Sequence, residues 1–252
     1  MRAPLDGTTQ LITGASSGIG AELARLLAPR AGTLILVARR TDRLETLATE
    51  LRGLKPGLTV QVESCDLADA AALGALVARL PPVDILINNS GMGDIGLFER
   101  SDAAKTDLMM RVNMTGLVQL TRLLLPGMVE RGSGDIVATA SVAGIKPIAL
   151  DPAYGLTKHA VVGFVRSVAE GMNRPGAPDV CVSAICPGYT ETGIIGDRIR
   201  DRIAERGVEL MTPEYVASVV VRAVTERAQG AQWVIWPGVE PSIYDWNPGI
   251  PS

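Results

Sequence analysis

The sequence of 252 residues has three cysteines, one histidine and only two phenylalanines. Cys65, Cys181 and Cys186 form no CxxC pair, and His159 is the only histidine that could join them, so neither a disulfide framework nor a zinc site is expected. We predict that the cysteines are small apolar strand residues. With so few aromatic residues, the core must be built mainly from Ala, Val, Leu and Ile, which suits helices packed on a buried sheet.

Long apolar runs and blocks of charge are also missing. No apolar stretch approaches the roughly 20 residues of a membrane-spanning helix, and residues 1–7 lack the basic start and apolar run of a secretion signal. Lys and Arg total 24 against 27 Asp and Glu, so nucleic-acid binding has no electrostatic support. We expect a cytoplasmic protein that binds neither membranes nor nucleic acid.

Short apolar runs rich in β-branched residues alternate with longer amphipathic stretches, and no repeat or linker divides the chain. This pattern predicts a single α/β domain over residues 1–252, with a doubly wound, seven-stranded parallel sheet covered by helices on both faces. The predicted strands are Gln10–Thr13, Thr33–Ala38, Thr59–Cys65, Asp84–Asn88, Asp135–Ser141, Val180–Cys186 and Trp233–Trp236. The predicted helices are Gly18–Ala28, Thr41–Arg52, Asp69–Arg79, Ser101–Glu130, Pro152–Met172 and Pro213–Arg227.

Two segments interrupt this alternation. Residues 193–211 carry many charges and an apolar row that falls on one helical face, at Ile195, Ile199 and Ile203. We predict a substrate lid there. Residues 237–252 begin with Pro237 and contain three further prolines and two aromatic residues, which exclude a regular helix, at Pro241, Tyr244, Trp246, Pro248 and Pro251. We predict an irregular C-terminal tail that wraps the surface or reaches a neighbouring subunit.

The first predicted strand runs directly into a glycine-rich turn and a helix. The turn reads Thr13-Gly14-Ala15-Ser16-Ser17-Gly18-Ile19-Gly20. Strand, glycine turn and helix together indicate a dinucleotide-binding Rossmann fold. Gly14 permits the tight turn, Gly18 lets the backbone approach a pyrophosphate and Gly20 allows close packing of helix on strand. We expect the turn residues, including Ser16, Ser17 and Ile19, to contact the cofactor at the helix N-terminus.

The end of the second predicted strand indicates which dinucleotide binds. An acidic residue at this place would bind the ribose 2′-hydroxyl of NAD, but the chain has Ala38 followed by Arg39 and Arg40. A guanidinium can bind a 2′-phosphate at two points, so Arg39, together with Arg40, favours NADP(H). The alternative, a solvated basic face on the next helix, explains Arg43 better than Arg39.

The motifs along the chain, and the order in which they occur, resemble those of the short-chain dehydrogenase/reductase family. The match spans nearly all of the sequence. The motifs are Thr13-Gly14-x3-Gly18-x-Gly20, Asp66, Asn88-Asn89-Ser90-Gly91, Asn113, Ser141, Tyr154-x3-Lys158 and Pro187-Gly188. The resemblance implies hydride transfer between a nicotinamide and a substrate carbon. Two departures, Ser90 where the family usually has Ala and the bulky Tyr189, leave the shape of the pocket open.

The resemblance also implies roles for individual residues. Tyr154 is the proton donor and acceptor, Lys158 binds the nicotinamide ribose, Ser141 hydrogen-bonds the substrate oxygen and Asn113 holds a water of a proton relay. Further cofactor contacts are implied at the adenine ring, along the groove and at the nicotinamide, by Asp66, Leu67, Asn88, Asn89, Gly91, Pro187, Gly188 and Thr192.

Elementary chemistry agrees with this assignment for one pair. Tyr154 and Lys158 are four residues apart, so on a helix they share a face. A free tyrosine has a pKa of about 10, too high for efficient acid-base catalysis near neutrality. We expect the Lys158 ammonium and the cationic oxidised nicotinamide to lower the pKa of Tyr154 by stabilising phenolate.

The predicted pocket wall is mostly apolar, which favours a hydrophobic ketone, aldehyde or secondary alcohol. It includes Met92, Ile95, residues 145–150, Tyr189 and the predicted lid. An NAD-dependent alcohol dehydrogenase and a non-catalytic NADP(H)-binding sensor are the alternatives. Family members usually form dimers or tetramers through the long helices, so the resemblance implies a homo-oligomer, with a tetramer preferred.

Overall fold

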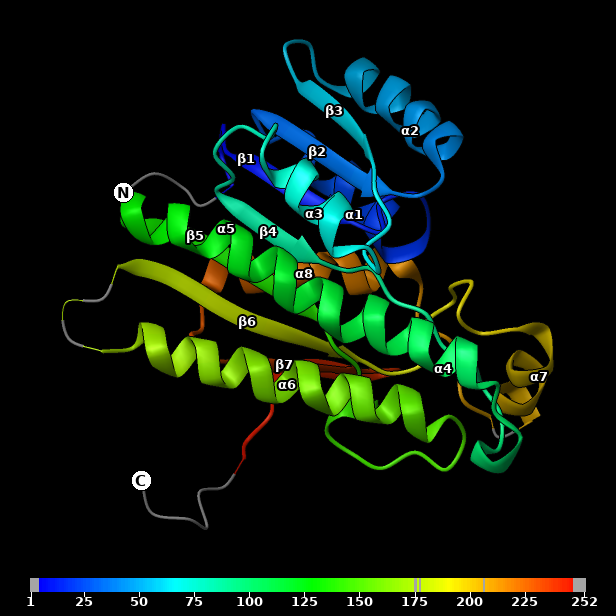
Figure 1. Cartoon of the computed structure of the whole chain (residues 1–252). Coiled ribbons are helices and arrows are strands. Elements are labelled where there is room, and N and C mark those ends of the chain that lie inside the picture. The colour runs from blue at the N-terminus through cyan, green and yellow to red at the C-terminus, as the bar shows by residue number, and fades with distance from the viewer. Residues whose placement is uncertain (1–4, 175, 177, 206, 247–252) are drawn as a thin grey trace.

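An eight-stranded sheet runs through the computed structural model, which describes residues 5–174, 176, 178–205 and 207–246 (Figure 1). The strand order is β3-β2-β1-β4-β5-β6-β7-β8, and every neighbouring pair is parallel except the last. The bounds are β1 (Thr9–Thr13), β2 (Thr33–Ala38), β3 (Thr59–Ser64), β4 (Ile85–Asn88), β5 (Ser133–Thr139), β6 (Asp179–Pro187), β7 (Gln232–Trp236) and β8 (Val239–Ile243). The doubly wound Rossmann fold is confirmed, and the predicted strands lie within two residues of the observed ones.

The antiparallel strand β8 corrects two predictions. The sheet has one strand more than the seven predicted, and the segment expected to be irregular pairs with β7, with Trp233 opposite Ile243 and Trp236 opposite Val239. Pro241 lacks an N–H for a strand ladder, but an edge strand tolerates it because one side of that strand has no partner. Residues 247–252, with the other two prolines, lie outside the described part of the chain.

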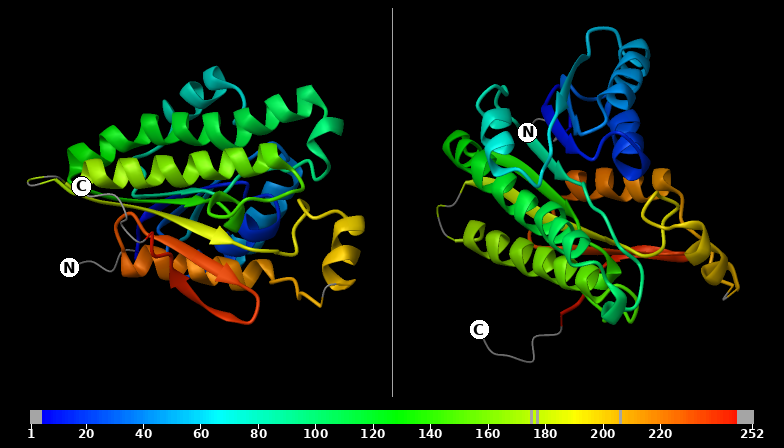
Figure 2. Two further views of the ribbon diagram at one scale, coloured as in Figure 1. Left: turned by 90° about the horizontal axis from the view of Figure 1, so that it is seen from below. Right: turned by 45° about the vertical axis from the view of Figure 1, so that its right-hand side comes forward.

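Helices cover both faces of the sheet (Figure 2). One face carries α1 (Gly18–Leu27), α2 (Thr41–Leu54) and α8 (Pro213–Glu226), and the other carries α3 (Ala70–Val77), α5 (Leu117–Arg131) and α6 (Pro152–Met172). Each face has its own aliphatic cluster, with side chains such as Leu23 and Val220 on one and Leu120 and Val161 on the other, all buried. These clusters hold the parallel strands so that their carboxyl ends lie together at one end of the sheet.

The predicted helix Ser101–Glu130 is not one regular helix. It consists of α4 (Ala103–Met110), a π-helical turn (Arg111–Gly116) and α5. A Cβ on Gly116 would lie 2.3 Å from the Leu67 carbonyl oxygen, so this glycine lets the helix approach the chain that follows β3. Such π turns occur often at functional sites, and this one carries Asn113.

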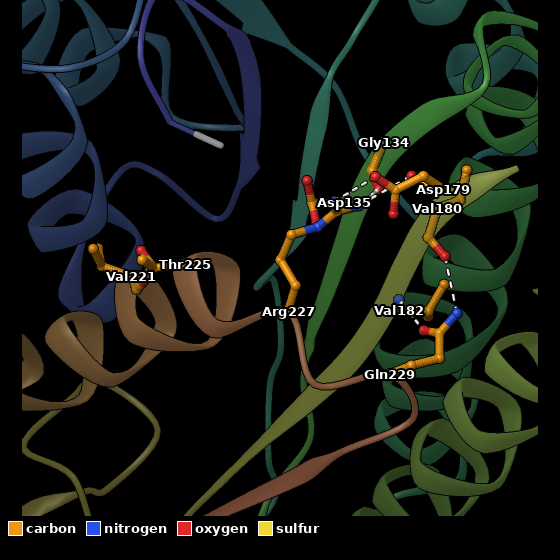
Figure 3. Close-up of polar contacts among 9 residues, drawn as sticks. All are labelled: Gly134, Asp135, Asp179, Val180, Val182, Val221, Thr225, Arg227 and Gln229. Carbon is orange, nitrogen blue, oxygen red and sulfur yellow. Dashed lines mark hydrogen bonds and ion pairs between the residues drawn. The ribbon is translucent and has the colours of Figure 1, made fainter. Parts of the chain in front are cut away.

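The amino ends of β5 and β6 are tied to the end of α8 by Arg227 (Figure 3). Its guanidinium contacts the carboxylates of Asp135 and Asp179, both at 2.8 Å, and the carbonyl oxygen of Asp179 at 3.0 Å. Arg227 has a φ of 51°, in the left-handed region that ends helices. This cluster lies at the edge of the sheet opposite the glycine-rich turn.

The three cysteines are buried and unpaired. None of the helices in the described ranges is long and apolar enough to cross a membrane. The same ranges contain no group of three or more His, Cys, Asp and Glu side chains that could hold a metal ion.

Candidate active site

One cleft of about 1250 Å³ opens at the carboxyl ends of the parallel strands. Pockets for a single small ligand usually measure about 300–1,000 Å³, so this cleft has room for a dinucleotide beside a substrate. Most of the predicted site residues line it, namely Gly14, Ser16, Ser17, Gly18, Ile19, Arg39, Arg40, Asp66, Leu67, Asn89, Gly91, Ser141, Tyr154, Lys158, Pro187, Gly188 and Thr192. Gly20 and Asn113 do not line the cleft themselves but contact residues that do, Gly14 and Met92 respectively.

The glycine turn has the geometry that a phosphate site requires. Gly14 and Gly18 have φ values of +69° and +55°, which disfavour any side chain. A Cβ on Gly20 would lie 2.4 Å from the Gly14 carbonyl oxygen, so Gly20 permits the close packing predicted for it. Helix α1 begins at Gly18 with no acidic residue in its first turn, which leaves its free N–H groups and positive dipole end to an anion.

Arg40 reaches from the start of α2 across to this turn. Its guanidinium donates to the Ser16 hydroxyl at 2.9 Å and to the Ser17 hydroxyl at 2.7 Å. Arg39 also lines the cleft, as does Ala38, which ends β2 without a carboxylate. The ribose end of the cleft therefore offers two guanidinium groups and two hydroxyls, a donor set that suits a phosphate.

A polar network joins the ends of β1, β4 and β5 beneath the cleft. The Thr13 hydroxyl accepts from the main-chain N–H groups of Asn89 and Ser90 at 2.9 and 3.0 Å, and Asn89 also contacts the hydroxyl of Thr139 at 3.2 Å. The expectation for Asn88 is wrong, because its buried side chain donates to Thr121 on α5 and does not line the groove. Along these two residues the strand alternation turns only Asn89 toward the cleft.

Tyr154 and Lys158 share the face of α6 that meets the end of β5. The Lys158 Nζ lies 5.5 Å from the centre of the Tyr154 ring and donates to the Thr139 carbonyl oxygen at 2.7 Å. Ser141, just beyond β5, is hydrogen-bonded to Tyr154, and its hydroxyl also contacts the Pro187 carbonyl oxygen at 3.3 Å. A hydroxyl, a phenol and an ammonium therefore meet at one end of the cleft.

The expected lowering of the pKa of Tyr154 is not found in the protein chain. Burial raises the pKa of Tyr154 to about 12, the hydrogen bond from Ser141 opposes that rise, and the charge of Asp151 adds to it. Burial also lowers the pKa of Lys158 to about 8. The chain by itself thus holds Tyr154 as a neutral phenol, the form that can donate a proton.

Asn113 fixes the loop opposite Tyr154. Its side-chain oxygen accepts from the Met92 N–H at 2.8 Å, and its amide donates to the Met92 carbonyl oxygen at 2.8 Å and to the Thr157 hydroxyl at 3.2 Å. The buried side chain therefore connects the π turn, the loop after β4 and α6. Its part in a proton relay stays a prediction.

Asp151, which sequence reasoning missed, anchors the start of α6. Its carboxylate accepts from the Tyr154 N–H at 3.0 Å and from the Asp94 N–H at 2.7 Å, and it is buried. Its φ of 67° is left-handed, a conformation that costs about 1–2 kcal/mol for a residue other than glycine. The dipeptide Asp151-Pro152 was the available signal, because Asp before Pro at the first helical position is a common N-cap.

Residues of the predicted lid segment line the cleft, and the segment stands to one side of the sheet in the ribbon (Figure 2). Its helix α7 (Asp197–Glu205) stands beyond the ends of the strands, and Ile195 and Ile203 are buried and line the cleft. The side chain of Ile199 lies outside what the structure describes. The segment is closed at its base by a bridge between Thr190 and Met211, and its closing as a lid stays a prediction.

Sequence reasoning also missed part of the cleft wall. Trp236 and Tyr244 line the cleft from the β7–β8 hairpin, a part of the chain taken for a strand end and an irregular tail. Thr139, which accepts the Lys158 hydrogen bond through its carbonyl oxygen, carries no side-chain signal for that role. The pairing of β8 was not predicted because Pro237 and Pro241, which lie between Trp236 and Tyr244, disfavour a strand.

Known proteins resemble this chain in sequence and in fold. The model of the short chain dehydrogenase family matches residues 8–203. The chain is 34% identical to the ketoacyl reductase HetN of Nostoc sp., over 88% of this chain and 77% of that protein. Solved structures include levodione reductase, with a TM-score of 0.84 and 28% identity over 93% of this chain and 98% of the other. They also include a short-chain dehydrogenase from Sphingobium yanoikuyae in complex with NADPH, with a TM-score of 0.79 and 32% identity over 92% and 88%.

Fold, motifs and relatives therefore agree, and the protein is an oxidoreductase of the short-chain dehydrogenase/reductase family, which uses a nicotinamide cofactor.

Proposed function

We propose that the protein is an NADP(H)-dependent reductase that interconverts a ketone or aldehyde and the corresponding alcohol. The observation that carries the proposal is the meeting of Ser141, Tyr154 and Lys158 at one end of a cleft whose other end is cationic. The relatives support it, since one is described as a ketoacyl reductase and one structural neighbour is in complex with NADPH. The block of residues 145–150, apolar except for Lys146, and Met92 give this end a mostly apolar wall for the rest of a substrate.

In this proposal each side chain has a defined part. The bound cofactor supplies the hydride, and the protein positions the substrate and moves the proton. The Ser141 and Tyr154 hydroxyls hydrogen-bond the carbonyl oxygen, and Tyr154 then donates its proton to that oxygen. Lys158, held by Thr139, places a positive charge beside the phenolate that results.

The preference for NADP(H) rests on Arg40, Arg39 and the absence of a carboxylate at Ala38. A 2′-phosphate placed near the Ser16 and Ser17 hydroxyls would take over the hydrogen bonds that Arg40 now donates to them. A cytoplasmic location and a dimer or tetramer built on the long helices also remain part of the proposal.

Removal of the phenol tests the catalytic assignment. We expect Tyr154→Phe to lower NADPH consumption at 340 nm with a panel of ketones and aldehydes by on the order of 100-fold or more, because the proton donor is lost. NADPH affinity should be retained. The matched control is Tyr215→Phe on α8, a half-exposed tyrosine outside the cleft. Tight NADPH binding without turnover of any carbonyl by the unaltered protein would favour the sensor.

Removal of a guanidinium tests the cofactor assignment. Arg40→Leu should weaken NADPH binding by roughly 10-fold or more and leave NADH binding nearly unchanged, because one charge-assisted contact to the 2′-phosphate is lost. Arg43→Leu, on the same helix but outside the cleft lining, is the control. Equal losses for the two cofactors would contradict the assignment and favour an NAD-dependent alcohol dehydrogenase.

A further inference from the structure

The aromatic residues of this chain gather at the candidate active site. The chain has only three Trp, four Tyr and two Phe. Besides Tyr154, three aromatic side chains line the cleft, namely Tyr189, Trp236 and Tyr244. They come from three separate elements, the loop after β6, the end of β7 and the residue after β8. We call these three side chains the aromatic wall.

Tyr189 and Trp236 form the part of the wall in which two rings contact each other. Their ring centres are 5.8 Å apart with planes tilted by 55°. Each side chain is a little over one third exposed, so part of each ring is open to the cleft. Tyr189 follows Pro187-Gly188, and the Pro187 carbonyl oxygen contacts the Ser141 hydroxyl. The pair thus lies close to the place where the substrate oxygen is expected.

The backbone around these two rings is fixed. A Cβ on Gly188 would lie 2.7 Å from Cε3 of Trp236, so the indole rests directly against the glycine. The Tyr189 carbonyl oxygen accepts from the Met211 N–H at 2.9 Å, at the base of the lid segment. The two rings are therefore held in place before a substrate binds, which lowers the entropic cost of stacking on them.

Tyr244 extends the wall along the sheet and is also anchored. Its N–H donates to the Gln232 carbonyl oxygen at 2.8 Å, and its ring meets Trp246 edge to face at 4.9 Å. Trp246 in turn lies 4.3 Å from the Arg166 guanidinium of α6 and donates to the side-chain oxygen of Gln232. The β7–β8 hairpin and α6 thereby hold Tyr244 on one side of the cleft.

We propose that the aromatic wall makes this enzyme select carbonyl substrates that carry a flat aromatic ring. Aromatic rings gain free energy from offset or edge-to-face contacts beyond the burial of area alone. The remaining lining at this end is mostly aliphatic, from Ile145, Ile148 and Ile194, with Lys146 as an added cation. The Asp151 carboxylate is already occupied by two main-chain N–H groups. The inference rests on the proposed reductase function and names its substrate class.

A pair of ketones that differ only in the ring tests the proposal. In 4-phenylbutan-2-one and 4-cyclohexylbutan-2-one the ring is separated from the carbonyl, so the reacting centres are alike. A pocket that is merely hydrophobic prefers the cyclohexyl compound, which has more apolar hydrogens to bury. We expect the unaltered protein to prefer the phenyl compound by roughly 10-fold in kcat/KM, the combined effect of two aromatic contacts.

Variants separate the wall from the rest of the protein. Trp236→Leu and Tyr189→Leu should each bring the ratio of the two kcat/KM values toward one, whereas Trp236→Phe should keep most of it. Tyr215→Leu, outside the cleft, should leave the ratio unchanged. NADPH affinity, measured by its fluorescence, shows for each variant that the cofactor end is intact.

A ratio at or below one in the unaltered protein, or a ratio that Trp236→Leu does not change, would overturn the aromatic preference while leaving the reductase proposal standing. If neither ketone is reduced, calorimetric binding of the two ketones to the NADPH complex decides the preference by itself. Tighter binding of the phenyl compound, lost in Trp236→Leu, would support the wall even then, and equal binding would refute it.

Discussion

Among the described residues, two residues other than glycine adopt left-handed backbone conformations. They lie near opposite ends of the parallel strands. Asp151 starts α6 beside the candidate active site, at the carboxyl ends of the strands, and Arg227 ends α8 near their amino ends. Both side chains hold main-chain or charged groups of other segments, so the cost of each strained conformation is offset by contacts. The two differ in what they hold.

Asp151 caps the helical turn that carries Tyr154, whereas Arg227 holds strands together. The Asp151 carboxylate binds the N–H of Tyr154 itself and that of Asp94 in the facing loop. Arg227 binds Asp135 and Asp179 at the starts of β5 and β6 (Figure 3), and none of these three residues lines the cleft. Under the proposed function, similar backbone strain serves turnover at Asp151 and stability at Arg227, and substitutions should separate these two effects.

The largest expected effect is on stability at Arg227. Arg227→Ala should lower the free energy of unfolding by about 3 kcal/mol, because Asp135 stays buried without its partner. Activity per folded molecule should not change. Asp179→Asn, which removes only the exposed arm of the cluster, should cost less than about 1 kcal/mol. Denaturant unfolding measures both.

Arg227→Gly is the matched variant for the backbone contribution. It loses the same ion pairs but relieves the left-handed strain, so it should be about 1 kcal/mol more stable than Arg227→Ala. Equal stability of the two variants would mean that the conformation carries no measurable strain, and a loss of activity in either would break the comparison with Asp151.

At Asp151 we expect an effect on turnover. Asp151→Ala should lower kcat by about 30-fold, on the order of 2 kcal/mol, since the first turn of α6 and the loop at Asp94 lose their shared anchor. KM for the cofactor should change little. Asp151→Asn should keep the cap on Tyr154 and remove the negative charge that raises the pKa of Tyr154 in the unaltered protein.

The pH profile distinguishes positioning by Asp151 from a purely structural role. Because the Asp151 charge disfavours phenolate, Asp151→Asn should lower the pKa of Tyr154 and move the alkaline fall of the reduction rate to lower pH. A variant with reduced kcat but an unshifted profile would show that only the helix start was disturbed.

The smallest effect is the pH dependence of stability at Asp135. Burial raises the pKa of Asp135 from 3.8 to about 6, and the Arg227 charge opposes that rise. The folded protein therefore binds the proton more tightly than the unfolded chain, and this contribution to stability, fully present below the unfolded pKa, is lost as pH rises through about 6. Relative to Asp135→Asn, the unaltered protein should gain about 1 kcal/mol between pH 7.5 and pH 5. A difference between the two proteins that does not change with pH would contradict the shifted pKa.

The sequence predicted most of the residues that line the cleft, because the signals for them are local. The glycine turn, the Tyr154–Lys158 spacing and the apolar strand runs depend on residues close together in the chain, and periodicity identifies such elements. The π turn at Asn113 was not predicted, since its sequence continues the helical pattern on both sides. Gly116, which packs against Leu67, shows that a tertiary contact sets this geometry.

What the sequence could not predict depends on contacts between distant segments. β8 is an edge strand with a proline in the middle, and only its pairing with β7 defines it. The sequence predicts a lower pKa for Tyr154 from the Lys158 ammonium and the oxidised nicotinamide, but in the protein chain burial dominates and raises it. Trp236 and Tyr244 likewise join the cleft only through the hairpin.

The bridge between Thr190 and Met211 has a consequence for how selectivity can diverge. The two ends of the segment between Thr190 and Met211 meet at this bridge. The length and composition of that segment can therefore change without altering the register of the sheet. The match to the family model ends at residue 203, inside this segment, and Trp236 and Tyr244 lie beyond it. The proposed aromatic wall thus combines Tyr189, from the matched stretch, with Trp236 and Tyr244 from beyond it. Grafting only the part beyond the match onto a relative should therefore transfer the proposed preference in part, while Tyr154 and Lys158 stay as they are.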